Sequence, residues 1–175
     1  MRLIKTGLIL MAAAALIAGC GGDDGGYNTK TVEGITLSWR TNDADDSLLV
    51  KVSATTIGMV LIGFYDDPLN GLRDANIITG YVVSDTAYVR DNYGTGEEAY
   101  APDTTAPGGT DDVTEKDGSE VEGVTEISFT IPLNSGDARD IVLELGQEHV
   151  VFLAWGTNDS HYSSFTVHVS TVIEL

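Results

Sequence analysis

Closely spaced carboxylates are the first residues in this sequence whose types and spacing suit a chemical role. The segment "TNDADDS" (41–47) places Asp43, Asp45 and Asp46 in a turn between two apolar segments. Calcium takes about six to eight oxygen ligands, and such carboxylates can supply several of them. The glycine and glutamate that complete an EF-hand loop are absent from their positions here. We therefore interpret this segment as an acidic hairpin loop, and "FYDDPL" and "GGTDDV" as weaker cases of the same kind.

Patterns that would indicate catalysis are missing. No "GxSxG" surrounds a serine nucleophile. The segment "GTGEEAY" (94–100) superficially resembles a phosphate loop, but Glu97 and Glu98 would repel a phosphate group. A glycosidase needs two carboxylates that flank the sugar, yet among 27 acidic residues no pair stands out. We therefore expect that the protein is not an enzyme.

Histidine and aromatic side chains are the remaining candidates for ligand binding. His149 opens an apolar segment, His168 lies on the polar face of the last alternating segment, and His161 follows "AWGTNDS" in a loop. Neutral imidazole is a good metal ligand, and aromatic rings near loops can stack on a sugar or a flat cofactor. The aromatic candidates are Trp39, Tyr88, Tyr93, Tyr100, Trp155 and Tyr162. The two tryptophans lie in apolar segments and are expected in the core, although Trp155 is kept as a pocket-lining candidate.

Apolar and polar residues alternate through most of the chain after Cys20, and this predicts the strands that must position these candidates. The regular spacing predicts an all-β protein: a single-domain antiparallel β-sandwich over residues 32–175. The last segment is expected to place Phe165, Val167 and Val169 on one face. The predicted strands are "GITLSWR" (34–40), "SLLVKVSATT" (47–56), "MVLIGF" (59–64), "ANIITGYVVSD" (75–85), "TAYVRDNY" (86–93), "GVTEISFTIPL" (123–133), "EHVVFLAWGT" (148–157) and "SSFTVHVSTVIEL" (163–175).

Several irregular features interrupt this pattern. The stretch 94–119 is rich in Gly, Pro, Thr and Asp, and a loop of that length is usually functional or mobile. A bulge is expected near Thr125. A short helical turn is predicted at 137–141, with Ser135 or Asp137 as its cap.

The N-terminal residues indicate export and lipid anchoring. Arg2 and Lys5 precede the apolar segment "GLILMAAAALIA", which is too short to span a bilayer comfortably. The following "LIAGC" matches the bacterial lipoprotein signal and contains Cys20, the only cysteine of the sequence. We therefore predict a signal peptide (1–19), a lipidated Cys20 and a flexible tether (20–31). The domain would be held in the cell envelope, on the outer side of the cytoplasmic membrane or in the outer membrane.

The charge balance limits the possible partners. The 27 acidic residues face only 9 basic ones, which gives a formal net charge of −18. Such a surface attracts cations and argues against binding to nucleic acid or to anionic membrane faces.

The order of the motifs resembles the DOMON family, the dopamine β-monooxygenase N-terminal type of domain. The resemblance spans roughly residues 34–175 and is most specific in "GYVVSDTAYVRDNYG" and "FTIPLNSGD". Also in order are "IGMVLIGF" and "VVFLAWGTNDSHY". The nearest branch binds haem or sugar in secreted and membrane-linked proteins. It implies an immunoglobulin-like sandwich with a ligand near one end.

In haem-binding members the resemblance implies a b-type haem between a methionine and a histidine. The family's methionine follows the "GF" strand, but the loop 65–76 contains no methionine; its apolar residues include Leu69 and Leu72, which we expect to line the pocket. Met59 is then the remaining sulfur ligand, although a core position is favoured for it. His161 is the best match for the histidine.

Three functions remain open from the sequence. The first is a haem-binding, electron-transfer module with a redox partner. The second is a carbohydrate-binding module, and the third is an interaction domain without a ligand. The loops 65–76, 94–119 and 156–164 would line the site, which we expect between the first and the last of them.

Overall fold

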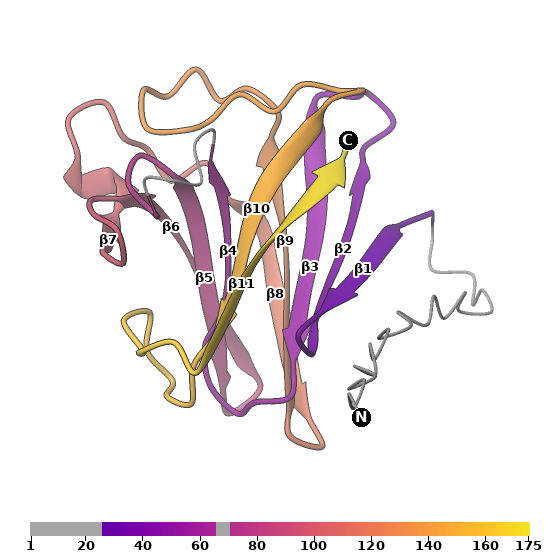
Figure 1. Ribbon diagram of the computed structural model, residues 1–175, viewed down its shortest axis with the longest axis vertical. Coiled ribbons are helices and arrows are strands. Elements are labelled where there is room, and N and C mark those ends of the chain that lie inside the picture. Colours follow the sequence, from indigo (N-terminus) through magenta and orange to yellow (C-terminus); the bar gives the residue numbers. More distant parts are fainter. Residues whose placement is uncertain (1–25, 66–70) are drawn as a thin grey trace, which may run out of the picture.

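The structure is a computed structural model that describes residues 26–65 and 71–175, and these residues form two antiparallel sheets packed face to face (Figure 1). The prediction of an all-β sandwich is therefore confirmed. The five-stranded sheet has the order β1 (Asn28–Val32), β2 (Ile35–Thr41), β3 (Ser47–Ala54), β9 (Val124–Pro132) and β8 (Thr114–Val121). The six-stranded sheet has the order β11 (Val167–Glu174), β10 (Glu148–Trp155), β4 (Val60–Tyr65), β5 (Asn76–Val83), β6 (Thr86–Gly94) and β7 (Tyr100–Pro102).

The main core lies between the two sheets. Successive side chains of a strand point to opposite faces, so the alternating segments of β2 and β3 each direct one set of side chains inward. Ile35 and Leu37 of β2 and Leu48 and Val52 of β3 are completely buried in this core. Burial of these apolar surfaces is the main term that holds the sheets together.

A second apolar cluster covers the outer face of the six-stranded sheet. Strand β4 is buried on both faces, because Ile62 faces the main core while Leu61 faces outward. The outer cluster consists of Met59, Leu61, Tyr65, Leu72, Ala75, Ile77 and Ala154, with Tyr100 and Phe165 among the residues packed against it. The outer face of this sheet is therefore apolar and covered by side chains from loops.

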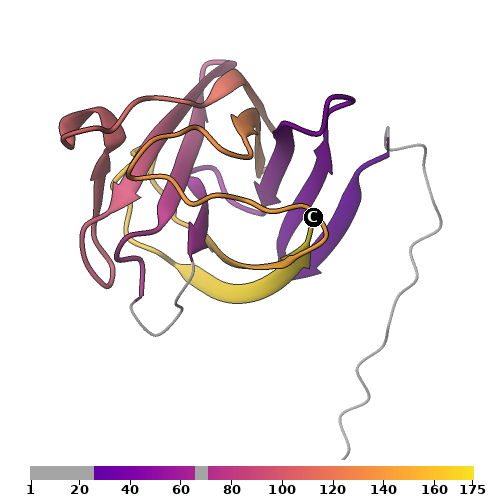
Figure 2. The same ribbon diagram turned by 90° about the horizontal axis from the view of Figure 1, so that it is seen from above.

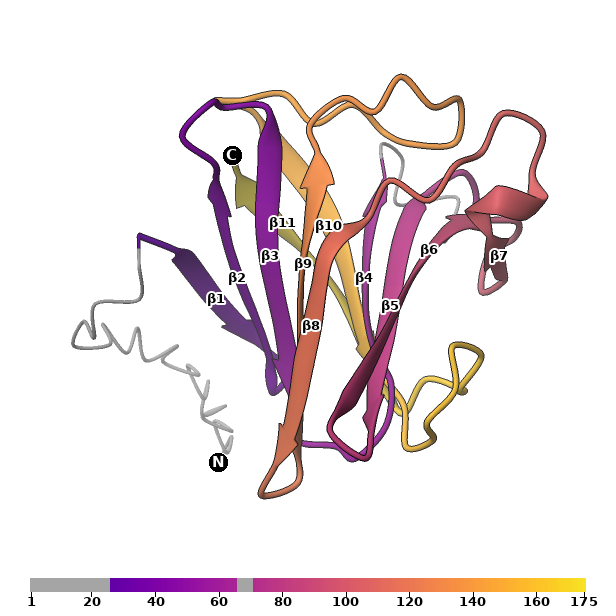
Figure 3. The same cartoon turned by 180° about the vertical axis from the view of Figure 1, so that it is seen from behind.

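Three strands of the structure are absent from the sequence-based prediction. Strand β1 begins at Asn28, inside the segment that we assigned to the tether. The stretch 94–119, predicted as a long loop, contains β7, a 3₁₀ helix η2 (Asp103–Thr105) and most of β8. Figure 3 shows β8 alongside β9 and η2 near the same end as the segment that links β9 to β10. These strands are polar or short, so they have no alternation to reveal them.

Local details also differ from the prediction. The pairing irregularity lies between Thr114 and Asp117 of β8, opposite β9, rather than near Thr125. Residues 137–141 form bends and extended chain instead of a helical turn. The side chains expected to cap that turn instead accept local backbone hydrogen bonds: Ser135 Oγ from Asp137 and Asp137 Oδ1 from Arg139.

The predicted signal peptide and Cys20 lie outside the described residues. Among residues 26–65 and 71–175, no helix is long and apolar enough to cross a membrane.

Candidate functional site

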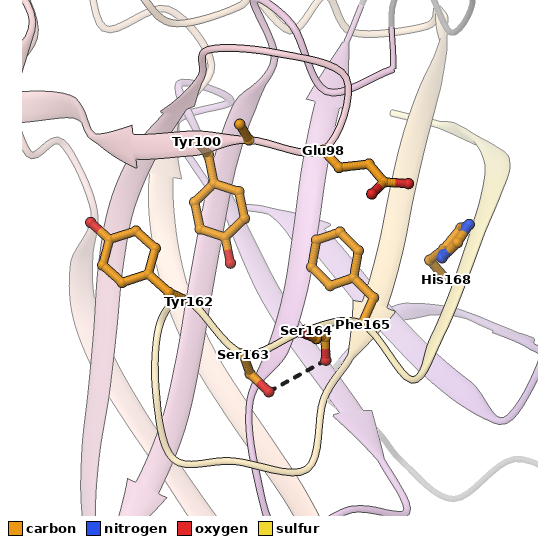
Figure 4. Close-up of a pocket in the computed structure, with 8 residues that line it drawn as sticks. Glu98, Tyr100, Tyr162, Ser163, Ser164, Phe165 and His168 are labelled. Atoms are coloured by element: carbon orange, nitrogen blue, oxygen red, sulfur yellow. Dashed lines mark hydrogen bonds between the residues drawn. The ribbon is translucent and has the colours of Figure 1, made fainter.

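A cavity of about 430 Å³ opens on the outer face of the six-stranded sheet (Figure 4). One wall is the segment that leads into β7, and the other is the segment between β10 and β11. The lining residues are Glu98, Ala99, Tyr100, Tyr162, Ser163, Ser164, Phe165 and His168. The cavity therefore combines aromatic rings with hydroxyl, carboxylate and imidazole groups.

Aromatic rings line the cavity in nearly parallel planes. The ring of Tyr100 lies between those of Tyr162 and Phe165, with centroid distances of 5.9 and 6.5 Å and interplanar angles of 19° and 9°. His168 meets the Phe165 ring edge-on at 6.2 Å. Tyr162 is 59% exposed, and Arg90 lies 4.6 Å above the centroid of its ring. A flat molecule or a sugar face can stack on such a surface.

The Tyr100 hydroxyl joins two candidate ligand residues at the base of this cavity. It lies 3.6 Å from Sδ of the completely buried Met59, and it also donates toward the carbonyl oxygen of His161. Burial raises the pKa of Tyr100 to about 12, so the hydroxyl keeps its proton at neutral pH. The Tyr100 hydroxyl therefore bridges the side chain of Met59 and the backbone of His161 on the same side of the sheet.

His161 is fixed by polar residues of β5 and β6. Its Nδ1 lies 2.8 Å from Oγ1 of Thr79, which accepts a further hydrogen bond from Nδ2 of Asn92 at 3.1 Å. Its ring meets that of Tyr81 edge-on at 4.9 Å. Burial, followed by the charges of nearby cations, lowers the pKa of His161 to about 4. The imidazole is therefore neutral at pH 7 and has a lone pair available to a ligand.

The structure brings together some of the residues nominated from the sequence. Tyr100 and Tyr162 line the cavity, and His161 and Met59 lie beside it through their contact with Tyr100. Met59 immediately precedes β4 and belongs to the outer cluster, so it already faces the side of the sheet on which the cavity opens.

Other nominated residues point elsewhere. Trp155 packs against the core between the sheets, because it shares the inward face of β10 with Val151 and Leu153. Tyr93 lies under the guanidinium of Arg139, 5.2 Å from its ring centroid, and does not line the cavity. Neither Trp155 nor Tyr93 therefore lines this cavity.

The described residues of the loop 65–76, which are 65 and 71–76, do not line this cavity. Leu72 is buried within the outer cluster, where its backbone N–H donates to the carbonyl of Glu97 at 2.9 Å. Leu69 lies outside the described residues. Among the described residues, the wall is formed instead by 98–100.

Several lining residues were not nominated from the sequence. Phe165 was expected on the inward face with Val167, but β11 begins only at Val167, which frees Phe165 to pack on the outer cluster. The polar face assigned to His168 is the outer face of the sheet, so its position carried a signal. The sequence carried no signal for Glu98, Ser163 and Ser164, because they line the cavity only when two loops meet in the folded chain.

Comparisons with known proteins match both the sequence and the fold. A model of the DOMON domain family matches residues 31–156, which is most of the chain. The cytochrome domain of Myriococcum thermophilum cellobiose dehydrogenase superposes with a TM-score of 0.50 at 15% sequence identity. That match covers 85% of this chain and 82% of the other, and at this identity it shows a shared fold. No curated protein sequence matches the chain.

Proposed function

The chain belongs to the DOMON domain family, and from that premise we propose that it is a ligand-binding module of the cell envelope whose ligand is b-type haem. The observation that carries this proposal is that the hydroxyl of Tyr100 contacts both Sδ of Met59 and the backbone carbonyl of His161, which places the two residues on the same side of the sheet. A bound haem would supply one-electron transfer to a redox partner.

The donor set and its surroundings suit haem. Methionine sulfur and neutral imidazole are axial ligands of haem iron in electron-transfer proteins, and the lowered pKa keeps His161 neutral. If Nδ1 of His161 carries the proton and donates to Thr79, the other ring nitrogen keeps its lone pair for a metal. The outer cluster and the rings of Tyr100 and Phe165 offer the apolar surface that a porphyrin requires. The fold shared with a cytochrome domain is consistent with this proposal.

Tyr100 is the residue that must change position. Its hydroxyl contacts Sδ of Met59 and the backbone carbonyl of His161, so the sulfur of Met59 would be free to bind iron only after the Tyr100 ring has moved. The ring is held by stacking and by these contacts, not by a strand interior, because β7 is only three residues long.

Haem titration of the full chain in detergent tests this proposal. The wild-type protein should bind haemin with a Soret band at roughly 400–430 nm. The His161→Ala variant should lack this Soret band. The Met59→Leu variant should bind haemin with an altered spectrum, because leucine keeps the apolar volume of methionine but removes its sulfur. His149→Ala is the matched control, because His149 contacts the backbone of Glu144 away from the cavity. If His161→Ala and Met59→Leu bind haemin with the wild-type spectrum and affinity, the proposal fails.

Carbohydrate binding is the second candidate, and the exposed aromatic surface favours it. Tyr162 presents its ring to solvent in a cavity that Glu98 and Ser163 also line, so sugar faces and hydroxyl groups would both find partners. In titrations with soluble oligosaccharides, Tyr162→Ala should weaken binding by about tenfold or more. A wild-type protein that binds haemin but no oligosaccharide would eliminate this alternative.

Attachment to the membrane is part of the proposal and derives from the sequence. The motif "LIAGC" supports lipidation of Cys20, and two acyl chains anchor a protein more stably than one. Such an anchor would hold the module in the cell envelope, within reach of a redox partner.

A further inference from the structure

Three aspartates meet at the end of the sandwich near η2, away from the cavity. Asp91 lies on β6, Asp103 opens η2, and Asp140 belongs to the segment between β9 and β10. One carboxylate oxygen from each lies within 4.8 Å of the others. Figure 2 shows the β9–β10 segment crossing this end of the molecule above the strands. The cluster therefore joins three segments that are distant in the sequence.

Asp91 and Asp103 are buried and Asp140 is half-buried, and each of the three has at least one carboxylate oxygen without a hydrogen-bond partner among the described residues. Asp103 is 1% exposed, and neither of its carboxylate oxygens has a hydrogen-bond partner among the described residues. Asp91 is 3% exposed: its Oδ2 accepts from the backbone of Asp112 at 3.1 Å, whereas its Oδ1 has no partner. One oxygen of Asp140 also lacks a partner. Buried carboxylates are costly unless a cation, a donor or a proton satisfies them.

Arg139 favours the charged form of Asp103, but within the described residues no salt bridge neutralises the cluster. In the described part of the chain, the only salt bridge joins Lys116 to Asp111, and Arg139 is directed to the ring of Tyr93. Asp137 adds a further carboxylate nearby, already bonded to the backbone N–H of Thr110 at 2.6 Å. The cluster is therefore a concentration of negative charge with unused oxygen lone pairs.

The backbone is shaped around Asp103. A Cβ placed on Gly109 would collide with the carbonyl oxygen and the carboxylate of Asp103. Only glycine at this position lets the loop close over the carboxylate. The segment "GGTDDV", which contains Gly109, was interpreted from the sequence as an acidic loop without a specific role.

We propose that Asp91, Asp103 and Asp140 bind a Ca²⁺ ion that ties β6, η2 and the β9–β10 segment together. The donor set is entirely oxygen, as hard cations require, and it contains no histidine or cysteine that would favour zinc. Calcium tolerates irregular geometry and completes its shell with backbone carbonyls and water, whereas Mg²⁺ demands a near-ideal octahedron. The site is separate from the cavity and does not depend on the proposed haem binding.

Burial also makes the carboxylates of this cluster harder to ionise. Burial, with a contribution from neighbouring carboxylates, raises the pKa of Asp91 to about 8 and that of Asp103 to about 6. Burial likewise raises the pKa of Asp140 to about 6. Without a cation the cluster retains protons near neutral pH, and a divalent ion would displace them.

Calcium titration of the full chain in detergent, after treatment with EDTA, tests this proposal. Calorimetry should detect one saturable Ca²⁺ site per chain, and the midpoint of thermal unfolding should rise by about 5–10 °C at a hundredfold excess over Kd. Asp103→Asn should abolish this rise and should itself raise the midpoint in EDTA, because it removes a buried charge. Asp43→Asn, in the exposed acidic turn, is the matched control and should respond like the wild type.

The outcomes discriminate clearly. The proposal is overturned if the unfolding midpoint of the wild type does not respond to 10 mM CaCl₂, a concentration at about the upper end of what an extracellular site requires. It is also overturned if the Asp103→Asn variant keeps the full rise in midpoint. An equal response to MgCl₂ would overturn the assignment to calcium. If Asp103→Asn does not fold, the half-buried Asp140→Asn variant decides by the same criteria.

Discussion

A single hydroxyl group sets the geometry of the candidate ligand site. Tyr100 is positioned by β7, contacts the buried Met59 and reaches the backbone of His161. His161 is itself held by Thr79, whose side chain is completely buried. The sequence nominated Met59, Tyr100 and His161 separately, but nothing in their spacing indicated that one side chain joins them. Such a contact arises only when loops far apart in the chain are folded against the same sheet.

The buried imidazole predicts a pH dependence of stability in the haem-free protein. The pKa of His161 falls from about 6.5 to about 4 on folding, because burial and the charges of Arg90 and Lys116 oppose protonation. Between these values the unfolded chain binds more protons, so the free energy of unfolding should decrease as the pH falls from about 6.5 to 4. We expect this residue to contribute a loss of about 1–2 kcal/mol, less than the full shift implies because the ring is half-buried.

Urea unfolding at several pH values measures this loss. The aspartates with raised pKa values act in the opposite direction, because their protonation stabilises the folded state as the pH falls. The contribution of His161 is therefore the difference between the wild type and His161→Gln. The variant should lose less stability than the wild type on acidification. Parallel profiles for the two proteins would contradict the prediction.

At the scale of elements, hydrophobic alternation revealed the strands that build the core. Strands β2, β3 and β9 each bury every second residue, and all three were predicted. Strand β8, "TEKDGSEV", is exposed along almost its whole length and adds to the sheet edge through backbone pairing with β9. Backbone pairing leaves no pattern of apolar side chains. The sequence therefore predicted the interior of the sandwich, but it did not predict the edge strands β1, β7 and β8.

The position of the loop between β10 and β11 depends on a close backbone contact. A Cβ on Gly58 would lie 2.5 Å from the backbone nitrogen of Asn158, just before Met59 and β4. Gly58→Ala should therefore destabilise the fold by about 1–3 kcal/mol and displace the segment that carries His161. Haemin or sugar binding should weaken with it. Gly96→Ala is the control, because the nearest contact of its Cβ would be an ordinary 3.5 Å to Ala99.

Chemical denaturation and ligand titration of these two variants provide the measurement. The comparison is informative because both glycines lie near the candidate site but differ in the space around the added methyl group. A Gly58→Ala variant with wild-type stability and ligand affinity would show that the loop adjusts without cost. That result would show that ligand binding does not depend on this position of the loop.

At the scale of the whole molecule, charge and anchoring determine where the domain acts. A net charge of −18 on 175 residues keeps the protein away from anionic surfaces, so electrostatic attraction to anionic lipids cannot hold it at a membrane. Any attachment to a membrane would therefore have to come from a covalent anchor or a protein partner. The glycine-rich segment after Cys20 would connect such an anchor to the sandwich.

Replacement of Cys20 by serine tests this anchor directly. The thiol of Cys20 is the only acceptor for a thioether-linked lipid in the sequence, so Cys20→Ser should lose lipid labelling completely. Because the lipoprotein peptidase acts on the lipidated precursor, we also expect the signal peptide to remain uncleaved. Metabolic labelling with a fatty acid and the electrophoretic mobility of the precursor measure the two effects. The wild type should be labelled and shortened. Labelling that persists in the Cys20→Ser variant would exclude Cys20 as the lipidation site. A wild-type protein that is cleaved normally but carries no label would indicate an ordinary secretory signal instead.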